Sequence, residues 1–241
     1  MNPKTSAWSG TMLLGVGWAM LDASAGDNRP HRHVAHQISL ALDTPCEIGG
    51  DRPVRLAPGE AALIPAGLLH SLAPAGAALR TIYVDPMFGG MRDFVHSQAI
   101  VALTKREASG LRSVDCGAAA KRWIGVFLGK GPARPIDQRL QAALVSLEPG
   151  ITPSTLALEI GLSPTRLREI AVRDFGVPTV KLLQWLQLQH AIDALHRSGS
   201  LADAAQAGGF SDQAHFTRRL IQWFGVTPSQ GLARLKISVI R

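Results

Sequence analysis

Three histidines in the first third of the sequence could bind a metal ion or hydrogen-bond to a small organic molecule. His31 and His33 stand two positions apart in the stretch HRHVAHQ, and side chains at this spacing share one face of a β-strand. His70 ends the stretch GEAALIPAGLLH, in which Pro65 and Gly67 predict a turn that directs it toward the same interior. Imidazole nitrogens on facing strands can hold zinc, nickel, manganese or iron.

A second group of polar side chains lies in the stretch GFSDQAHFTRRLIQWFGVTP, residues 209–228. Ser211 and Asp212 can cap a helix at its start, and Phe216 and Leu220 mark the buried face of that helix. The polar side chains between them have no acidic partner on the same turn; they are Gln213, His215, Arg218 and Arg219. The partner of this polar face can be inferred only from the fold in which the helix lies.

The elements that must position these groups change in kind once along the chain. Residues 8–85 contain short apolar runs with turn signals about every ten residues, which predicts a compact β-barrel or sandwich. From about residue 91 to 127 the apolar spacing becomes helical, and GKGPARP at 129–135 predicts a linker. Everything after it has helical spacing. The expected fold class is therefore α+β, with an N-terminal β-barrel followed by an all-α part.

The helical part contains an internal repeat. LALEIGLSPTRLREIAVRDFGVP at 156–178 aligns with DAAQAGGFSDQAHFTRRLIQWFGVTP at 203–228, with one residue inserted at the second turn. In each copy a small alanine packs where two helices cross, a glycine four residues later permits a sharp turn, and a serine is expected to cap the next helix. The repeat predicts two helix-turn-helix units. One long connecting helix between them would let both enter successive major grooves, about 34 Å apart, on one face of DNA.

At this point the sequence resembles a known family. Residues 136–235 resemble the DNA-binding domain of AraC/XylS-type bacterial transcription regulators, with the signature AGGFSDQAHFTRRLIQWFGVTPSQ. The resemblance implies two helix-turn-helix units per subunit and binding to double-stranded promoter DNA. Arg218 can form a bidentate pair with guanine and Gln213 with adenine. The positions that the resemblance assigns to DNA are Thr165, Arg166, Arg168, Glu169, Gln213, Ala214, His215 and Arg218.

The N-terminal part resembles a cupin. GEAALIPAGLLH fits the second cupin motif and HRHVAHQ resembles the first, with Gln37 where a glutamate ligand would stand. A regular strand would place His36 on the opposite face. Three interpretations stay open: a bound divalent transition metal, a metal-free pocket for an organic effector, and purely structural histidines. The candidate effector or metal site consists of His31, His33, His70 and Gln37.

The two resemblances together imply a cytoplasmic transcription regulator that is not an enzyme. We expect a cupin-like sensor and dimerisation domain at residues 1–130 and a DNA-binding domain at 131–241, acting as a homodimer and responding to a small-molecule or metal effector. One alternative is a metal-dependent cupin isomerase or dioxygenase with an accessory helical domain, which Gln37 in place of a carboxylate disfavours. The other is a structural DNA-binding protein without a ligand.

Composition is compatible with this interpretation. The chain has 241 residues, a net charge of +7 and a pI of about 10.1, which favours polyanionic partners without identifying one. Cys46 and Cys116 are far apart and lack metal-site spacing, as expected of free thiols in a reducing cytosol. The apolar run at 12–21 predicts a buried strand rather than a secretion signal, and no run is long enough to span a membrane.

Overall fold

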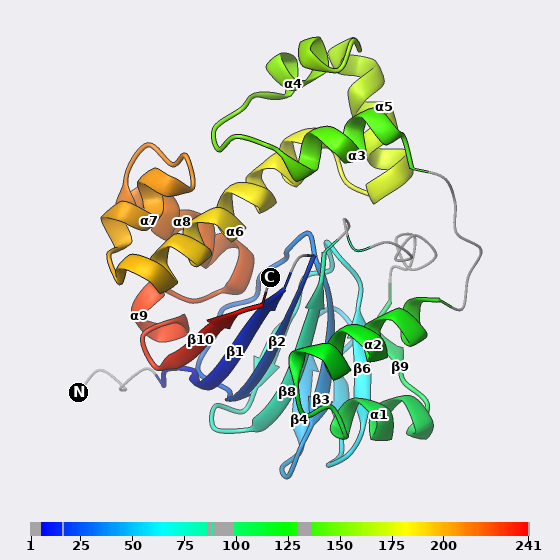
Figure 1. Ribbon diagram of the computed structural model, residues 1–241. Helices are drawn as coiled ribbons and strands as arrows, with labels where there is room; N and C mark the ends of the chain where they lie inside the picture. Colours follow the sequence, from blue (N-terminus) through cyan, green and yellow to red (C-terminus); the bar gives the residue numbers. More distant parts are fainter. Residues whose placement is uncertain (1–5, 16, 86–87, 89–98, 130–135, 241) are drawn as a thin grey trace.

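The structure is a computed structural model that describes residues 6–15, 17–85, 88, 99–129 and 136–240 (Figure 1). Its strands are β1 (Ser9–Gly15), β2 (Trp18–Ser24), β3 (His36–Ala41), β4 (Cys46–Gly49), β5 (Val54–Leu56), β6 (Ala61–Ile64), β7 (Ser71–Ala73), β8 (Ala78–Val84), β9 (Val101–Ala102) and β10 (Leu235–Val239). Its helices are α1 (Lys105–Arg112), α2 (Gly117–Leu128), α3 (Gln138–Val145), α4 (Pro153–Glu159), α5 (Pro164–Phe175), α6 (Thr179–Ser198), α7 (Leu201–Ala207), α8 (Gln213–Phe224) and α9 (Pro228–Gly231). The expected α+β fold class is confirmed.

The strands of the described residues form two sheets. The larger sheet has the order β10-β1-β2-β8-β3-β6-β9, and the smaller has the order β5-β4-β7. One apolar core joins them, because Ile48 and Leu56 of the smaller sheet pack with Leu21, Ile64 and Leu79 of the larger one. The alternation of side chains along each strand supplies this inner face. The result is the barrel-like, two-sheet architecture expected for residues 8–85.

Helices α1 and α2 cover the other face of the larger sheet (Figure 1). Ile38 and Leu40 of β3 face these helices, where Leu111 of α1 and Ile124 of α2 are fully buried. Helical structure was expected from about residue 91, and it is confirmed from residue 105 onward. Residues 101–102 instead form the short strand β9. The part of the expected helical stretch at 91–98 lies outside the described residues.

The internal repeat appears as two closely similar helix-turn-helix units, α4–α5 and α7–α8. The turn glycines Gly161 and Gly209 have φ angles of 68° and 71°, which L-residues rarely adopt. The same backbone hydrogen bond closes both turns: Leu162 donates to Ala157 at 2.8 Å, and Phe210 donates to Ala205 at 2.9 Å. The two turns therefore agree in backbone geometry as well as in sequence, as the repeat predicts.

One detail of the repeat differs from the expectation. Ser163 caps α5 and accepts from the backbone of Arg166, but the corresponding cap of α8 is Asp212, which accepts from the backbone N–H of His215. Ser211 instead donates to the Asp212 carboxylate at 3.1 Å. The inserted residue explains the change, because it moves the start of α8 one position along the chain.

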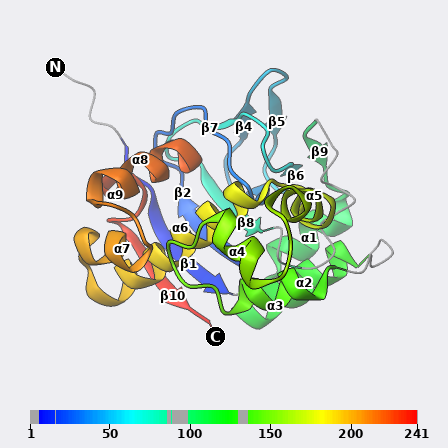
Figure 2. The same cartoon turned by 90° about the horizontal axis from the view of Figure 1, so that it is seen from above.

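Helix α6 is the long connecting helix, with 20 residues, and it lies over β1, β2 and β8 in both views (Figure 2). Leu182, Leu183 and Leu186 pack with the first unit, whereas Leu188 and Ile192 pack with the second. Its hydrophobic surface therefore divides between the two units along its length. No helix in the described part of the chain is both long and apolar enough to cross a membrane.

Strand β10 was not expected, because the chain after residue 131 was predicted to be all helix. It pairs in parallel with β1, from Gly10 opposite Leu235 to Leu14 opposite Val239. The sequence LKISV alternates apolar and polar residues, and its burial alternates in the same way. The segment that follows the second unit therefore completes the edge of the larger sheet. The proposed domain division at residue 130 itself falls outside the described residues.

A close backbone contact seats the second unit on the sheet region. Gly225 ends α8 in the left-handed conformation, with φ 69°, and its carbonyl accepts from the backbone N–H of Arg29 at 3.0 Å. A Cβ at Gly225 would overlap the carbonyl oxygen of Arg29 and lie 3.0 Å from Nδ1 of His31. The approach is possible only because the residue has no side chain.

We expect Gly225→Ala to destabilise the protein more than Gly199→Ala. Gly199 is the matched control, because it ends α6 at φ 68° and a Cβ at this position would meet no atom within 4 Å. The left-handed backbone alone should cost about 1 kcal/mol in either variant. The clash with Arg29 should add about 1 to 3 kcal/mol for Gly225. Chemical denaturation measures the free energy of unfolding of both variants. Equal losses of stability in the two would contradict the close contact between Gly225 and Arg29.

Candidate functional site

The structure brings together the three histidines of the candidate site. One ligand atom from each of His31, His33 and His70 lies within 4.8 Å of the others, and all three side chains are buried. His31 and His70 form an isolated antiparallel bridge, with backbone hydrogen bonds of 2.9 and 3.0 Å. The expectation that His31 and His33 share a regular strand is wrong, because β3 begins only at His36. The loop before β3 nevertheless turns both imidazoles inward.

Gln37 completes the cluster and joins it to a buried polar chain. Its Oε1 lies 3.0 Å from Nε2 of His33 and 3.1 Å from Nε2 of His70. Its Nε2 donates to the hydroxyl of Ser39 at 2.9 Å, and that hydroxyl lies 3.1 Å from the hydroxyl of Thr81. Gln37, Ser39 and Thr81 are all completely buried. Ser39 and Thr81 were not expected from the sequence, although the alternation of Gln37 and Ser39 with apolar neighbours marks one face of β3.

The outer ring nitrogen of each histidine is held by a backbone carbonyl. Nδ1 of His31 lies 2.8 Å from the carbonyl of Arg29, and Nδ1 of His33 lies 2.7 Å from that of Ala35. Nδ1 of His70 lies 2.9 Å from the carbonyl of Leu68. A carbonyl only accepts, so each Nδ1 carries the proton and each Nε2 of the neutral ring keeps a lone pair.

Burial keeps these rings neutral. Desolvation lowers the pKa of His31 to about 3, and the nearby His70 contributes to that lowering. Desolvation also lowers the pKa of His33 and of His70 below the usual range. The lowered pKa values favour the neutral imidazole, which is the form that binds a metal ion.

His36 stands apart from the cluster: it is the first residue of β3, and Gln37 beside it projects from the opposite face of that strand. Its Nδ1 accepts from the backbone N–H of Ala66 at 3.2 Å, and its buried Nε2 has no hydrogen-bond partner among the described residues. Burial lowers its pKa to about 4. The contact with Ala66 holds the turn between β6 and His70, so the role visible for His36 is structural.

Aromatic residues cover the cluster on the side of the second unit. The ring of His33 lies 5.4 Å from that of Tyr83 and 5.9 Å from that of Phe224, the last residue of α8. Trp185 of α6 lies 6.5 Å from His33 and stacks on Trp223 at 5.3 Å. The cluster is thus in contact with the end of α8. The sequence carried no signal for this contact, since it joins segments almost 200 residues apart.

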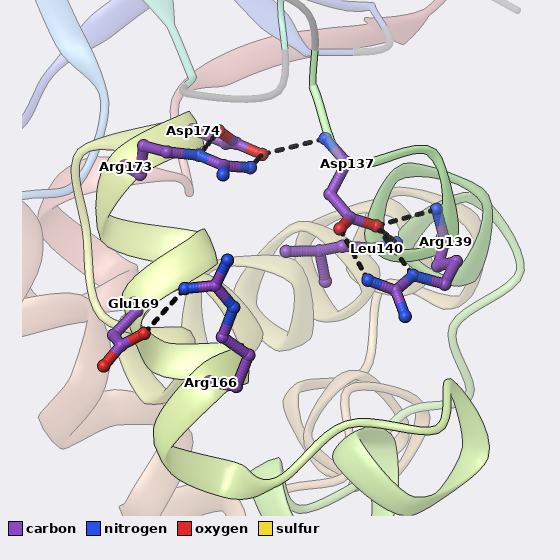
Figure 3. Close-up of polar contacts among 7 residues, drawn as sticks. All are labelled: Asp137, Arg139, Leu140, Arg166, Glu169, Arg173 and Asp174. Carbon is purple, nitrogen blue, oxygen red and sulfur yellow. Dashed lines mark hydrogen bonds and ion pairs between the residues drawn. The ribbon is translucent and has the colours of Figure 1, made fainter.

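The four residues assigned to DNA in the first unit lie on the outer face of α5. Thr165, Arg166, Arg168 and Glu169 are exposed, while Leu167 between them is fully buried. Arg166 pairs with Glu169 at 2.9 Å (Figure 3). Both side chains are more than half exposed, and exposed pairs of this kind stabilise proteins little. The pair can therefore open when the Arg166 guanidinium meets a phosphate or a base.

Arg173, near the end of α5, is bound to the residue that follows it. Its guanidinium donates to the buried Asp174 carboxylate at 2.6 and 2.9 Å, and that carboxylate accepts from the backbone N–H of Asp137 at 2.8 Å (Figure 3). Asp137 in turn caps α3. The group ties α5 to the start of α3, and Arg173 itself is half exposed.

The second unit presents Gln213, Ala214 and Arg218 as exposed residues of α8. His215 is half-buried, and its Nδ1 lies 3.2 Å from the hydroxyl of Ser211. Arg219 lies differently from Arg218: it donates to Gln222 at 2.8 Å, and its guanidinium lies 5.6 Å from the centre of the Trp223 ring. The polar face described from the sequence is therefore present on α8, and Arg218 is exposed on it.

Comparisons with known proteins agree with this arrangement. Residues 156–234 match the HTH_18 family, described as a helix-turn-helix domain. An apo variant of ToxT from Vibrio cholerae strain SCE256 is similar in structure, with a TM-score of 0.59 and 11% identity, over 88% of this chain and 96% of that one. ToxT from Vibrio cholerae O395 has a TM-score of 0.55 and 10% identity, over 94% and 95%. ToxT bound to an unsaturated fatty acid has a TM-score of 0.53 and 9% identity, over 95% and 96%. No curated protein sequence matches.

We expect Arg218→Ala to weaken binding to DNA by about 1 to 3 kcal/mol and to relax preference at one base pair, as loss of a base-reading arginine does. Arg219→Ala is the matched control, because Arg219 is adjacent but lies against Trp223. Sequences selected from a random duplex pool would be compared for the two variants and the wild type. A uniform loss over all sequences in Arg218→Ala would contradict base reading by this side chain.

Proposed function

We propose that this chain, an AraC-type transcription regulator, senses a divalent transition metal in its cupin-like N-terminal part and thereby changes how its second helix-turn-helix unit meets promoter DNA. The observation that carries the proposal is the convergence of His31, His33, His70 and Gln37 in one buried site. The exposed faces of α5 and α8 supply the contacts to DNA. Because the target is DNA, we place the protein in the cytoplasm.

The donor set fits a transition metal. As the amide of Gln37 is oriented, its Oε1 faces Nε2 of both His33 and His70 at hydrogen-bond distance. None of these three atoms carries a proton when each Nδ1 donates to its carbonyl, so lone pairs face one another in a buried site. A cation relieves this conflict, and three imidazoles with one amide oxygen suit borderline ions such as zinc or nickel. Bound there, the metal would act as a charge that holds the loop before β3.

The same residues also form a closed network without a metal if the Gln37 amide is reversed. Its two N–H groups would then donate to His33 and His70, and its oxygen would accept from Ser39, whose hydroxyl is within 2.9 Å of the amide. Thr81 would complete the chain by donating to Ser39. The orientation of one amide therefore separates a metal-binding state from a metal-free state.

The site is placed to act on the second unit. The carbonyl of Arg29 holds Nδ1 of His31, and the N–H of the same residue donates to Gly225 at the end of α8. Phe224 lies on His33. A ligand that moves the loop around His31 must therefore move the end of α8 or break its contact with Arg29. A DNA-binding protein controlled by a ligand requires this kind of coupling.

We further propose that the site senses rather than catalyses. Catalytic metal sites keep an open position for water or substrate, whereas this cluster has four protein donors and is covered by Phe224 and Tyr83. A residue that could act as a general base in the enzyme alternative would normally be a carboxylate, and the residue in that place is Gln37. We propose that residues 1–130 form the sensing part and 131–241 the DNA-binding part, apart from β10, which lies in the sheet of the sensing part.

We expect untagged protein to bind about one zinc or nickel ion per chain, measured by elemental analysis and by calorimetric titration. His70→Ala should lose at least about tenfold in affinity, since one of few ligands is removed. His196→Ala is the matched control, because His196 is an exposed histidine of α6. The metal should also change the affinity of wild type, but not of His70→Ala, for DNA selected from a random pool. Failure of wild type to bind either ion would rule out the metal and leave the metal-free network.

We also propose that the protein acts as a homodimer through its N-terminal part. Val126 of α2 is 73% exposed, and α2 lies within residues 1–130, the part that is expected to dimerise. Light scattering of the full chain at micromolar concentration should give about twice the 25.7 kDa of one chain. Val126→Glu should halve that mass, whereas Val145→Glu, a similarly exposed valine of α3, should not. A wild-type monomer would show that sensing operates within one chain.

A further inference from the structure

A cavity lies between the larger sheet and the connecting helix α6. Its volume is about 630 Å³, within the range of small-molecule pockets, roughly 300 to 1,000 Å³. One wall is the face of β1, β2 and β8 that lies under α6, and the opposite wall is α6 itself. Leu144 and Val145 of α3 and Phe175 of α5 close one end. The cavity therefore has walls from the sheet and from the helical part, including Phe175 of the first helix-turn-helix unit and Phe224 of the second.

The floor of the cavity is one row of side chains across the sheet. Tyr83 of β8 pairs with Ala19 of β2, Ala19 pairs with Leu14 of β1, and Leu14 pairs with Val239 of β10. All four line the cavity. The next member of the row is Gln37, which pairs with Tyr83 and belongs to the histidine cluster. The two sites are neighbours on one sheet face but are distinct, because none of the cluster residues lines the cavity.

The charge of the lining restricts the class of ligand. The carboxylates among the described lining residues are Asp85 and Asp193, and no lysine or arginine is among them. Asp85 accepts from Gln189 at 2.8 Å and from Trp185 at 3.4 Å, and Asp193 pairs with Arg197 at 2.9 Å. An anion in this cavity would lose its hydration and meet two carboxylates, so the site disfavours it.

One polar group in the apolar floor can hold a ligand. The hydroxyl of Tyr83 makes no hydrogen bond with any other described residue, while its ring packs on His33 and Phe224. A tyrosine hydroxyl without a partner in an apolar site can donate to, or accept from, a neutral group of a bound molecule. It gives the cavity one anchoring point at the end nearest the histidine cluster.

We propose that this cavity binds an uncharged, largely apolar molecule with one hydroxyl or carbonyl group, anchored at Tyr83. Its body would lie on Leu14 and Ala19 of the sheet and against Leu144 of α3 and Phe175 of the first unit. Such a ligand contacts the sheet and the first unit at once, and so it would fix their relative position. This site is separate from the metal site, because none of the cluster residues lines it, although Phe224 of the second unit also lines the cavity.

The matched probes are 1-decanol and decanoate, which share a carbon chain and differ in charge at pH 8. Trp18 and Trp185 line the cavity, so tryptophan fluorescence and the melting temperature of the full chain report binding. We expect decanol to bind at least tenfold more tightly than decanoate. Decanoate binding as tightly as decanol, or no response to decanol up to its solubility limit, would overturn the proposal.

Substitutions inside and outside the cavity test where decanol binds. Ala19→Phe should fill the floor and weaken decanol binding at least tenfold, whereas Ala78→Phe, a half-buried alanine of the same sheet outside the cavity, should not. Tyr83→Phe should weaken it about three- to tenfold, the effect of losing one hydrogen bond. His70→Ala should leave it intact, which separates this site from the metal site. Unchanged binding in both Ala19→Phe and Tyr83→Phe would place the ligand elsewhere and refute the assignment.

Discussion

The arrangement of the two halves depends on the backbone contact between Gly225 and the loop that carries His31. A recognition helix normally ends wherever its cap allows, but α8 ends against Arg29, and only a glycine fits there. Everything around the contact follows from this closeness: Phe224 covers the histidine cluster, Trp223 stacks on Trp185, and Val34 and Ala35 enter the core of the second unit. The second unit thus shares a hydrophobic core with the loop that forms the candidate ligand site.

The two candidate ligand regions differ in the physics that would fill them. The histidine cluster is small, buried and rich in lone pairs, so it selects by charge and donor type. The cavity is large and apolar, so it selects by shape and by the absence of charge. The cluster contacts the second unit, whereas the cavity is lined by Phe175 of the first unit and by Phe224 of the second. One face of the larger sheet therefore carries two candidate sites for chemically different ligands, and Tyr83 is in contact with both sites.

Local signals made the helical half predictable from the sequence. The repeated Ala and Gly predict two turns, whose glycines have nearly identical φ angles. Helical spacing identified the buried Phe216 and Leu220. The histidines were found through motif spacing, although the loop that carries His31 and His33 is not the strand that the alternation predicted. What the sequence could not supply was contact between distant segments. Neither the contact of Gly225 with Arg29 nor the cavity below α6 has a local sequence signal. Each is formed by segments that are far apart in the sequence, and no single segment has an unusual pattern.

Strand β10 bears on how such a protein can be rebuilt or can evolve. The second unit is preceded by a helix that lies on the larger sheet and followed by a strand that belongs to this sheet, so it is joined to the sheet at both of its ends. Exchange of the DNA-binding half at the linker alone would remove β10 and leave β1 as an unprotected edge, which is a template for intermolecular strand pairing. In a functional chimera, residues 235–239 would have to come from the same protein as the sheet with which they pair. The two halves are therefore constrained to change together, and their boundary in space does not coincide with any single cut in the sequence.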